Sequence, residues 1–131
     1  MVALSEGHLA MENLERARAY ALRALNALPP EGDPIAHGWA LRILARAELA
    51  LGDVDASRDR LGEARARFDS IGARFEAAIT VFALAEAANA QQDALAAAQY
   101  LGEAYRNFDA LGLPFWTALV AQTAGEHAIA I

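Results

Sequence analysis

LGEARARFDSIG at residues 61–72 returns as LGEAYRNFDALG at residues 101–112. The two stretches share Leu, Gly, Glu, Ala, Phe, Asp and a final Gly at the same places, and Phe75 likewise returns as Phe115. A fixed period of about 20–50 residues is typical of stacked-repeat proteins, in which each unit buries its apolar face against its neighbours. The repeat therefore predicts an extended surface rather than an enclosed catalytic pocket.

The composition favours an all-α fold. The chain has 131 residues, of which 56% are hydrophobic, and Ala supplies much of that share. Ala is the best helix former, and the four Pro and nine Gly residues stand mostly between helical stretches. The length suits one domain with a continuous core, so residues 1–131 are expected to form a single repeat domain.

The charge and the N-terminal sequence narrow the functional classes. The net charge is −6 and every basic residue is Arg, which argues against direct nucleic-acid binding because phosphate neutralisation dominates that affinity. Cys is absent, so disulfides and thiolate chemistry are excluded. Residues 1–6 lack the basic region of a signal peptide, and no apolar run approaches the roughly 18 residues of a membrane span. We therefore expect a cytoplasmic protein, and the Arg-only, Ala-rich usage suggests a GC-rich bacterial source.

Gly and Pro mark the expected helix ends. Pro29–Pro34 ends one helix, and Asp33-Pro34 supplies an N-cap and a first helical residue for the next. Turns are expected at Glu12-Asn13, Gly52-Asp53, Gly72, Gln91–Asp93 and Gly112. The expected helices are Val2 to about Met11, Leu14–Leu28, Pro34 to about Leu51, Val54–Ile71, Phe75–Ala90, Ala94–Leu111 and Phe115 to the C-terminus.

The spacing along these hairpins resembles the tetratricopeptide repeat family. The first helix of its unit carries a large residue, a Leu and a small residue, and the second carries a small residue, a bulky one and Ala. The matching residues are Leu41, Leu44, Ala45, Ser57, Leu61 and Ala64, then Val81, Leu84, Ala85, Ala97, Leu101 and Ala104. The resemblance implies a right-handed α-solenoid of antiparallel hairpins, with about seven helices in three and a half units. The long second helices are similar to the repeats of bacterial maltose-regulator-like ATPase activators and nucleotide cyclases.

The ends of such an array need a polar cap, but residues 128–131 read Ala-Ile-Ala-Ile. We expect the chain to be a piece of a longer array. The alternative is that its uncapped end helices dock against another copy as a homodimer.

In this family a concave groove lined by the first helices commonly holds a partner peptide. The implied groove residues here are Trp39, Arg42, Arg46, Ile79, Phe82, Glu86, Asn89, Leu119, Gln122 and Glu126. Arg42 and Arg46 share a helix face and could receive a carboxylate, or they could pair with intramolecular acids such as Glu48 or Glu86. Trp116 is expected to pack in the core, and Trp39 either packs or anchors a partner.

No arrangement of residues suggests catalysis. His8, His37 and His127 lack metal-ligand spacing, and there is no G-x-S-x-G or phosphate-binding Gly loop. No catalytic, cofactor or metal site is therefore expected. The leading function is protein or peptide binding within a bacterial regulatory or signalling protein. The alternatives are a sugar-type inducer sensor using Trp39 or Phe82 as a platform, and a self-association element.

Overall fold

The computed structural model describes residues 2–29 and 31–131, and the side chains of residues 10–29 and 31–131. These residues form six α-helices and no strand. The helices are α1 (Val2–Ala27), α2 (Pro34–Ala50), α3 (Val54–Ser70), α4 (Arg74–Ala90), α5 (Ala94–Ala110) and α6 (Pro114–Glu126). The chain is all-α, as its composition predicts, but the expected count of about seven helices is wrong for the described residues.

The difference lies at the start of the chain, where one helix replaces two expected ones. Glu12 and Asn13 lie inside α1 rather than in a turn. Glu is a good helix former, Asn is only a moderately poor one, and neither Gly nor Pro stands beside them to end the helix. The 40-residue repeat predicts a turn here, because Glu12-Asn13 is the position equivalent to Gly52-Asp53. The local sequence instead supports a continuous helix.

The remaining helices follow a regular spacing. Helices α2 to α6 begin at residues 34, 54, 74, 94 and 114, so each begins 20 residues after the one before it. In each turn the N–H of the last residue donates back to the preceding helix, as from Asp53 to the carbonyl of Glu48 at 2.8 Å. This bond and a left-handed middle residue define the Schellman motif. The left-handed residues are Gly52, Gly72, Gln92 and Gly112, which confirms four of the five expected turns.

The start of α2 also confirms its prediction. The carboxylate of Asp33 accepts a hydrogen bond from the backbone N–H of Ile35 at 3.0 Å, and Pro34 is the first helical residue. Pro is favoured at this place because its missing N–H would have no helical partner there.

The last helix is shorter than expected. It ends at Glu126 instead of continuing to the C-terminus. Ala128 has a φ of 53°, and the N–H of Ile129 donates to the carbonyl of Ala124 at 2.8 Å. This turn brings Ile129 back against the core around α6, which buries part of its side chain. Burial of that side chain is a physical reason for the early end of the helix.

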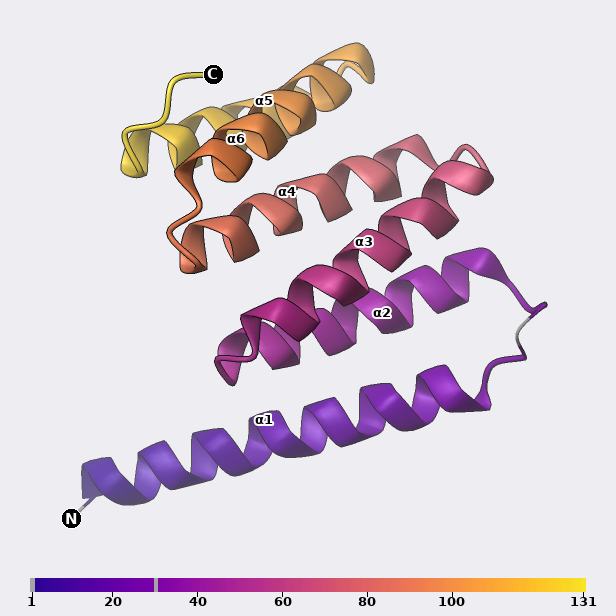
Figure 1. Cartoon of the computed structure of the whole chain (residues 1–131), viewed down its shortest axis with the longest axis vertical. Coiled ribbons are helices and arrows are strands. Elements are labelled where there is room, and N and C mark those ends of the chain that lie inside the picture. The colour runs from indigo at the N-terminus through magenta and orange to yellow at the C-terminus, as the bar shows by residue number, and fades with distance from the viewer. Residues whose placement is uncertain (1, 30) are drawn as a thin grey trace.

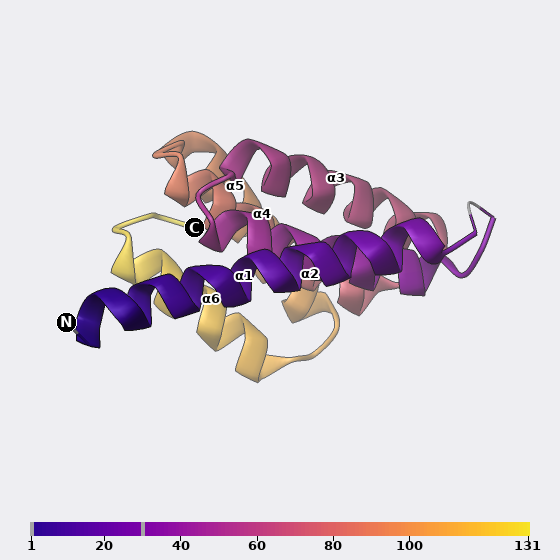
Figure 2. The ribbon, with the colours of Figure 1, turned by 90° about the horizontal axis from the view of Figure 1, so that it is seen from below.

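Each helix packs mainly on its neighbours in the chain. Figure 1 shows the helices stacked in order, from α1 at one end to α5 and α6 at the other. Figure 2, turned by 90°, places α3 and α5 in one layer and α2, α4 and α6 in the other. This arrangement is compatible with a helical repeat, in which α2–α3 and α4–α5 are successive hairpins.

The core continues through both layers. Around Phe68, the side chains of Leu41, Ala64 and Ala77 join α2, α3 and α4, and partly buried Leu25 adds α1. Around Phe108, residues of α4, α5 and α6 form a second cluster that includes Val81, Leu101 and Val120. Phe68 and Phe108 are both fully buried and occupy equivalent places in the repeat. The sequence repeat is thus also a packing repeat.

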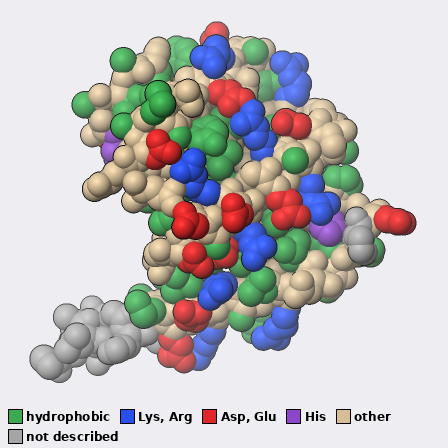
Figure 3. Space-filling view, viewed as in Figure 1, with side chains coloured by type: hydrophobic (Ala, Val, Ile, Leu, Met, Phe, Trp, Pro, Cys, Tyr) green, Lys and Arg blue, Asp and Glu red, His purple; other side chains and the backbone are tan. Residues whose placement is uncertain are grey.

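Charged side chains gather on the face formed by α3 and α5. Figure 3 shows basic and acidic groups intermingled there. Arg65 pairs with Glu103 across these two helices, and Arg58 lies 3.4 Å from Asp93 in the turn before α5. This face therefore carries mixed charge rather than a basic patch. None of the described helices is long and apolar enough to cross a membrane.

Candidate binding groove

The layer formed by α2, α4 and α6 carries the residues expected to line a groove. The predicted positions recur along these helices at intervals of three or four residues, so each set lies on one helix face. The layer contains three adjoining hollows. We describe them from α2 to the C-terminal end of α6.

The first hollow lies along α2. It has a volume of about 270 Å³ and is lined by Trp39, Arg42, Ile43 and Arg46. Trp39 is 48% exposed and Ile43 is 57% exposed, so two large apolar side chains face solvent one helical turn apart. Trp39 is therefore on the surface, which answers the question that the sequence left open between packing and exposure.

The second hollow spans all three helices of the layer. It has a volume of about 280 Å³ and is lined by Arg46 from α2, by Ile79, Phe82, Ala83 and Glu86 from α4, and by Trp116 and Leu119 from α6. Five of these residues belong to the predicted groove set. Phe82 is only 7% exposed, so it forms part of the floor rather than a free aromatic platform.

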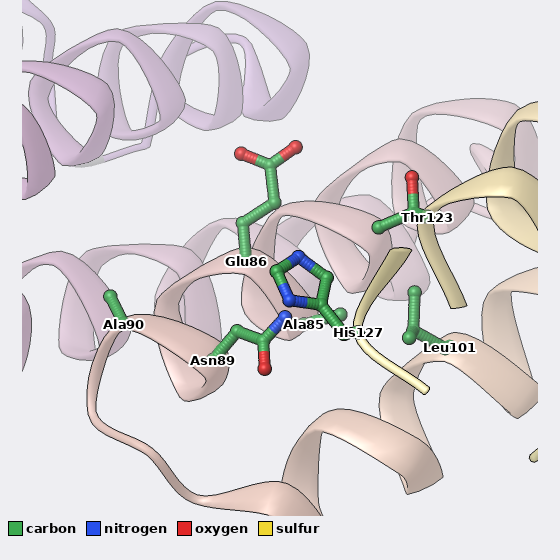
Figure 4. A pocket seen from close by; sticks show the side chains of 7 residues that line it. All are labelled: Ala85, Glu86, Asn89, Ala90, Leu101, Thr123 and His127. Atoms are coloured by element: carbon green, nitrogen blue, oxygen red, sulfur yellow. The ribbon is translucent and has the colours of Figure 1, made fainter. Parts of the chain in front are cut away.

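The third hollow lies between the C-terminal halves of α4 and α6. It has a volume of about 280 Å³, and its lining is Ala85, Glu86, Asn89, Ala90, Leu101, Thr123 and His127. Figure 4 shows Asn89 and His127 pointing toward one another, whereas the carboxyl group of Glu86 points away from them. This end is more polar at its rim, and Leu101 of α5 reaches it from behind.

Shared residues join the three hollows. Arg46 lines both the first and the second, and Glu86 lines both the second and the third. The three hollows therefore form one continuous depression across α2, α4 and α6, which we call the groove. Its floor is apolar, with a basic group between the first two hollows and an acidic group between the last two.

The two arginines of the groove differ in their contacts. Arg42 lies 2.5 Å from the carboxylate of Glu76, and its guanidinium stacks over the ring of Phe68 at 5.4 Å. It thus pairs within the molecule, but with Glu76 rather than with Glu48 or Glu86. Arg46 is exposed and forms no ion pair with the described side chains. Of the two, only Arg46 offers its charge to a ligand.

Glu86 has an altered acidity. Loss of hydration against the packed helices raises the pKa of its carboxyl group, and the positive charge of Arg46 lowers it in part. Arg46 is thus close enough to act on Glu86 through space without forming an ion pair with it. The pair places opposite charges along the groove.

Trp116 serves both the core and the groove. Its ring stacks on Phe108 with centroids 5.0 Å apart and meets Phe75 edge-on at 5.7 Å. This contact confirms the expected packing role. Because Trp116 also lines the second hollow, the same side chain supports the groove from beneath.

The structure does not bring every predicted residue into the groove. Gln122 donates to Glu126 at 3.2 Å, and both are exposed outside the three hollows. In turn, the prediction missed Ile43, Ala83 and Thr123. These three are separated by the repeat spacing of 40 residues, so the period itself could have found them once Ile43 was placed beside Trp39. It also missed His127, which is exposed and lines the third hollow.

Comparison of the chain with protein-family models, with curated proteins and with solved structures finds no match.

Proposed function

We propose that this chain is a non-catalytic, tetratricopeptide-like module that binds a protein partner through a peptide segment lying in the groove. The observation that carries the proposal is the continuity of the three hollows, which Arg46 and Glu86 join across α2, α4 and α6. A depression that follows several helices suits an extended or helical segment better than a compact ligand.

The chemistry of the groove suggests how such a segment would bind. Trp39, Ile79 and Leu119 supply apolar contacts, and the helices behind them are already packed, so little ordering is needed on binding. The guanidinium group of Arg46 can bind a carboxylate of the partner through two hydrogen bonds. Arg42 is less suited to this role, since it already pairs with Glu76. Asn89 adds a hydrogen-bonding group near the far end. We therefore expect a partner segment with apolar residues and an acidic side chain.

The wider setting is part of the same proposal. The right-handed solenoid and a place in a bacterial, cytoplasmic signalling or transcription-regulatory protein follow from the residues that resemble the tetratricopeptide family and from the Arg-only composition. The packing of consecutive helices supports the repeat part of this proposal.

A sugar-type sensor has less support from the groove. Phe82, one of its two expected platforms, is almost fully buried. Each hollow is also open to solvent, whereas sites for small ligands enclose most of the ligand surface. A saturable change in tryptophan fluorescence with a small sugar, but with no peptide, would support the sensor instead.

The two arginines provide a matched test of peptide binding. Peptides would be selected from a random displayed library against the wild-type chain, and the affinity of the best acidic peptide measured by titration calorimetry. Arg46→Ala is expected to weaken binding about tenfold, the loss of one charge-assisted contact, while stability stays within about 0.5 kcal/mol. Arg42→Ala is expected to lower stability by about 1–2 kcal/mol through loss of Glu76 and Phe68, with the smaller effect on affinity.

Two further variants locate the peptide. Trp39→Ala lies in the first hollow and should weaken binding, whereas Leu95→Ala, which is 74% exposed on α5, should not. If selected peptides bind the Arg46 and Trp39 variants as tightly as the wild type, the groove is not their site and the proposal is wrong.

A further inference from the structure

The outer side of α6 carries small residues that are exposed, whereas the residues at the equivalent positions of α4 are buried. Ala118, Ala121 and Gly125 are all exposed. Their counterparts in α4, 40 residues earlier, are Ala78, Val81 and Ala85, and each of these is at most 2% exposed. In α4 this stripe is covered by Leu101, Ala104 and Phe108 of α5. We call Ala118, Ala121 and Gly125 the tail stripe.

Along α1 there is a second set of residues that are more exposed than their counterparts 40 residues later in the chain. Ala17 and Ala24 are exposed and Leu28 is partly exposed. Their counterparts in α3 are Ser57, Ala64 and Phe68, which are all fully buried. In α3 this stripe is covered by α2, where Leu41 packs on Ala64 and Phe68, and the hydroxyl of Ser57 donates to the carbonyl of Ala45 at 2.8 Å. We call Ala17, Ala24 and Leu28 the head stripe.

The two stripes are the two halves of one interface that the molecule already contains twice. In α2–α3 and in α4–α5, a tail-type stripe packs on a head-type stripe. A hollow of about 340 Å³ lies between α1 and α2, beside the head stripe. It is lined by Leu14, Ala17, Ile43, Arg46, Ala47 and Ala50. Its counterpart between α3 and α4 is filled, because Ala45 and partly buried Leu49 pack there with Val54 and Ala87.

We propose that the occupant of these faces is a second copy of this chain, with the tail stripe of one copy seated on the head stripe of the next. The partner must supply a helix with small residues at the tail-stripe spacing on one side and an Ala- and Leu-bearing helix on the other. This chain carries both. The contact is heterologous, because the two surfaces differ, and each added copy again presents both stripes. Association therefore continues head to tail and places the helices of successive copies in the spacing of the internal repeat.

No residue of either stripe lines the groove, so this inference can be tested separately from peptide binding, although the hollow beside Ala17 shares Ile43 and Arg46 with the first hollow of the groove. It is tested on the chain alone, by sedimentation velocity between about 10 µM and about 1 mM, the range that separates weak self-association from none. The wild type is expected to show a sedimentation coefficient that rises steadily with concentration, without a plateau at a dimer.

Two charge substitutions separate the halves of the contact. Ala121→Glu blocks the tail stripe and Ala24→Glu blocks the head stripe, and both positions are exposed, so the fold should be kept. Each variant alone is expected to raise the dissociation constant about tenfold or more, since an unpaired carboxylate would be buried in the contact. Ala66→Glu, exposed elsewhere on α3, is the matched control and should associate like the wild type.

Mixing the two variants gives the decisive measurement. Ala121→Glu retains a working head stripe and Ala24→Glu retains a working tail stripe, so an equimolar mixture should form a one-to-one heterodimer that grows no further. A wild type that stays monomeric throughout the range would overturn the proposal. So would single variants that still associate, or a mixture that behaves as the sum of its parts, which would indicate an interface between identical surfaces.

Discussion

The ring of Phe68 lies against the backbone of Gly38, so closely that a Cβ at residue 38 would stand within 3.0 Å of three ring carbons. Gly38 is inside α2, where glycine ordinarily weakens a helix. We expect Gly38→Ala to lower the free energy of unfolding by about 1–3 kcal/mol, because the fully buried ring has no room to move. Urea denaturation followed by circular dichroism measures the change.

Gly62→Ala is the control for this substitution. Gly62 also lies inside a helix, but nothing stands within 4 Å of its Cβ position. The same change should there raise stability by about 0.5–1 kcal/mol through helix propensity alone. If both substitutions changed the free energy of unfolding by the same amount, the close contact between Phe68 and Gly38 would not limit how closely α2 and α3 pack.

Gln92 occupies a place where the three equivalent turns have glycine. It has a φ of 58°, beside values of 68–89° at Gly52, Gly72 and Gly112. A side chain is strained in this left-handed region, so Gln92→Gly should stabilise the chain by about 0.5–1 kcal/mol. Gln99→Gly, the same exchange inside α5, should instead destabilise it by about 1 kcal/mol. Thermal unfolding of both variants would reveal whether the signs differ; a loss of stability in both would contradict the turn assignment.

Glu48 is the one carboxyl group among the most deeply buried side chains of the described residues. Loss of hydration raises its pKa, and Asp53 adds to this, whereas Arg60, 3.4 Å away on α3, and Arg18 of α1 lower it in part. The folded chain thus binds this proton more tightly than the unfolded chain. The contribution of Glu48 to stability is therefore greatest below the unfolded value near 4.5 and declines as the pH rises through the folded pKa.

Glu48→Gln removes this pH dependence. At neutral pH the variant should equal the wild type or exceed its free energy of unfolding by up to about 1 kcal/mol, since Arg60 can turn to solvent. The difference should shrink as the pH falls toward 4.5. Urea denaturation at a series of pH values measures both curves, and Glu48→Met should move them in the same direction. A wild type that loses stability relative to Glu48→Gln on acidification would show that the ion pair outweighs burial.

The sequence predicts most of the fold because local signals mark most of its boundaries. Gly52, Gly72 and Gly112 end their helices through backbone conformation, which depends on the residue itself. The turns expected from them lie within a residue of those observed. The wrong turn at Glu12-Asn13 came from the repeat register alone, with no glycine or proline to support it. The end of α6 depends on Ile129 reaching the core, which is a tertiary contact that local sequence does not reveal.

The sequence predicts the residues of the groove about as completely as it predicts the fold. The period places Arg46, Ile79 and Leu119 on one face, and in the structure these three residues line the second hollow together. The pairing of Arg42 with Glu76 was not predictable, because these residues are 34 positions apart and belong to different helices, α2 and α4. Gln122 and Glu126 lie within α6 at the places that the period gives them, but both are exposed outside the three hollows, which the sequence pattern did not reveal.

The uniform pitch of 20 residues from α2 to α6 has a consequence for how such a chain can change length. Loss or duplication of one helix with its turn would carry every later helix into the opposite layer, with its apolar side toward water. Loss or duplication of two helices would leave every later helix in its own layer, packed against the same kind of neighbour. Viable insertions and deletions in this part of the chain are therefore expected in pairs of helices, and an odd number would expose a core.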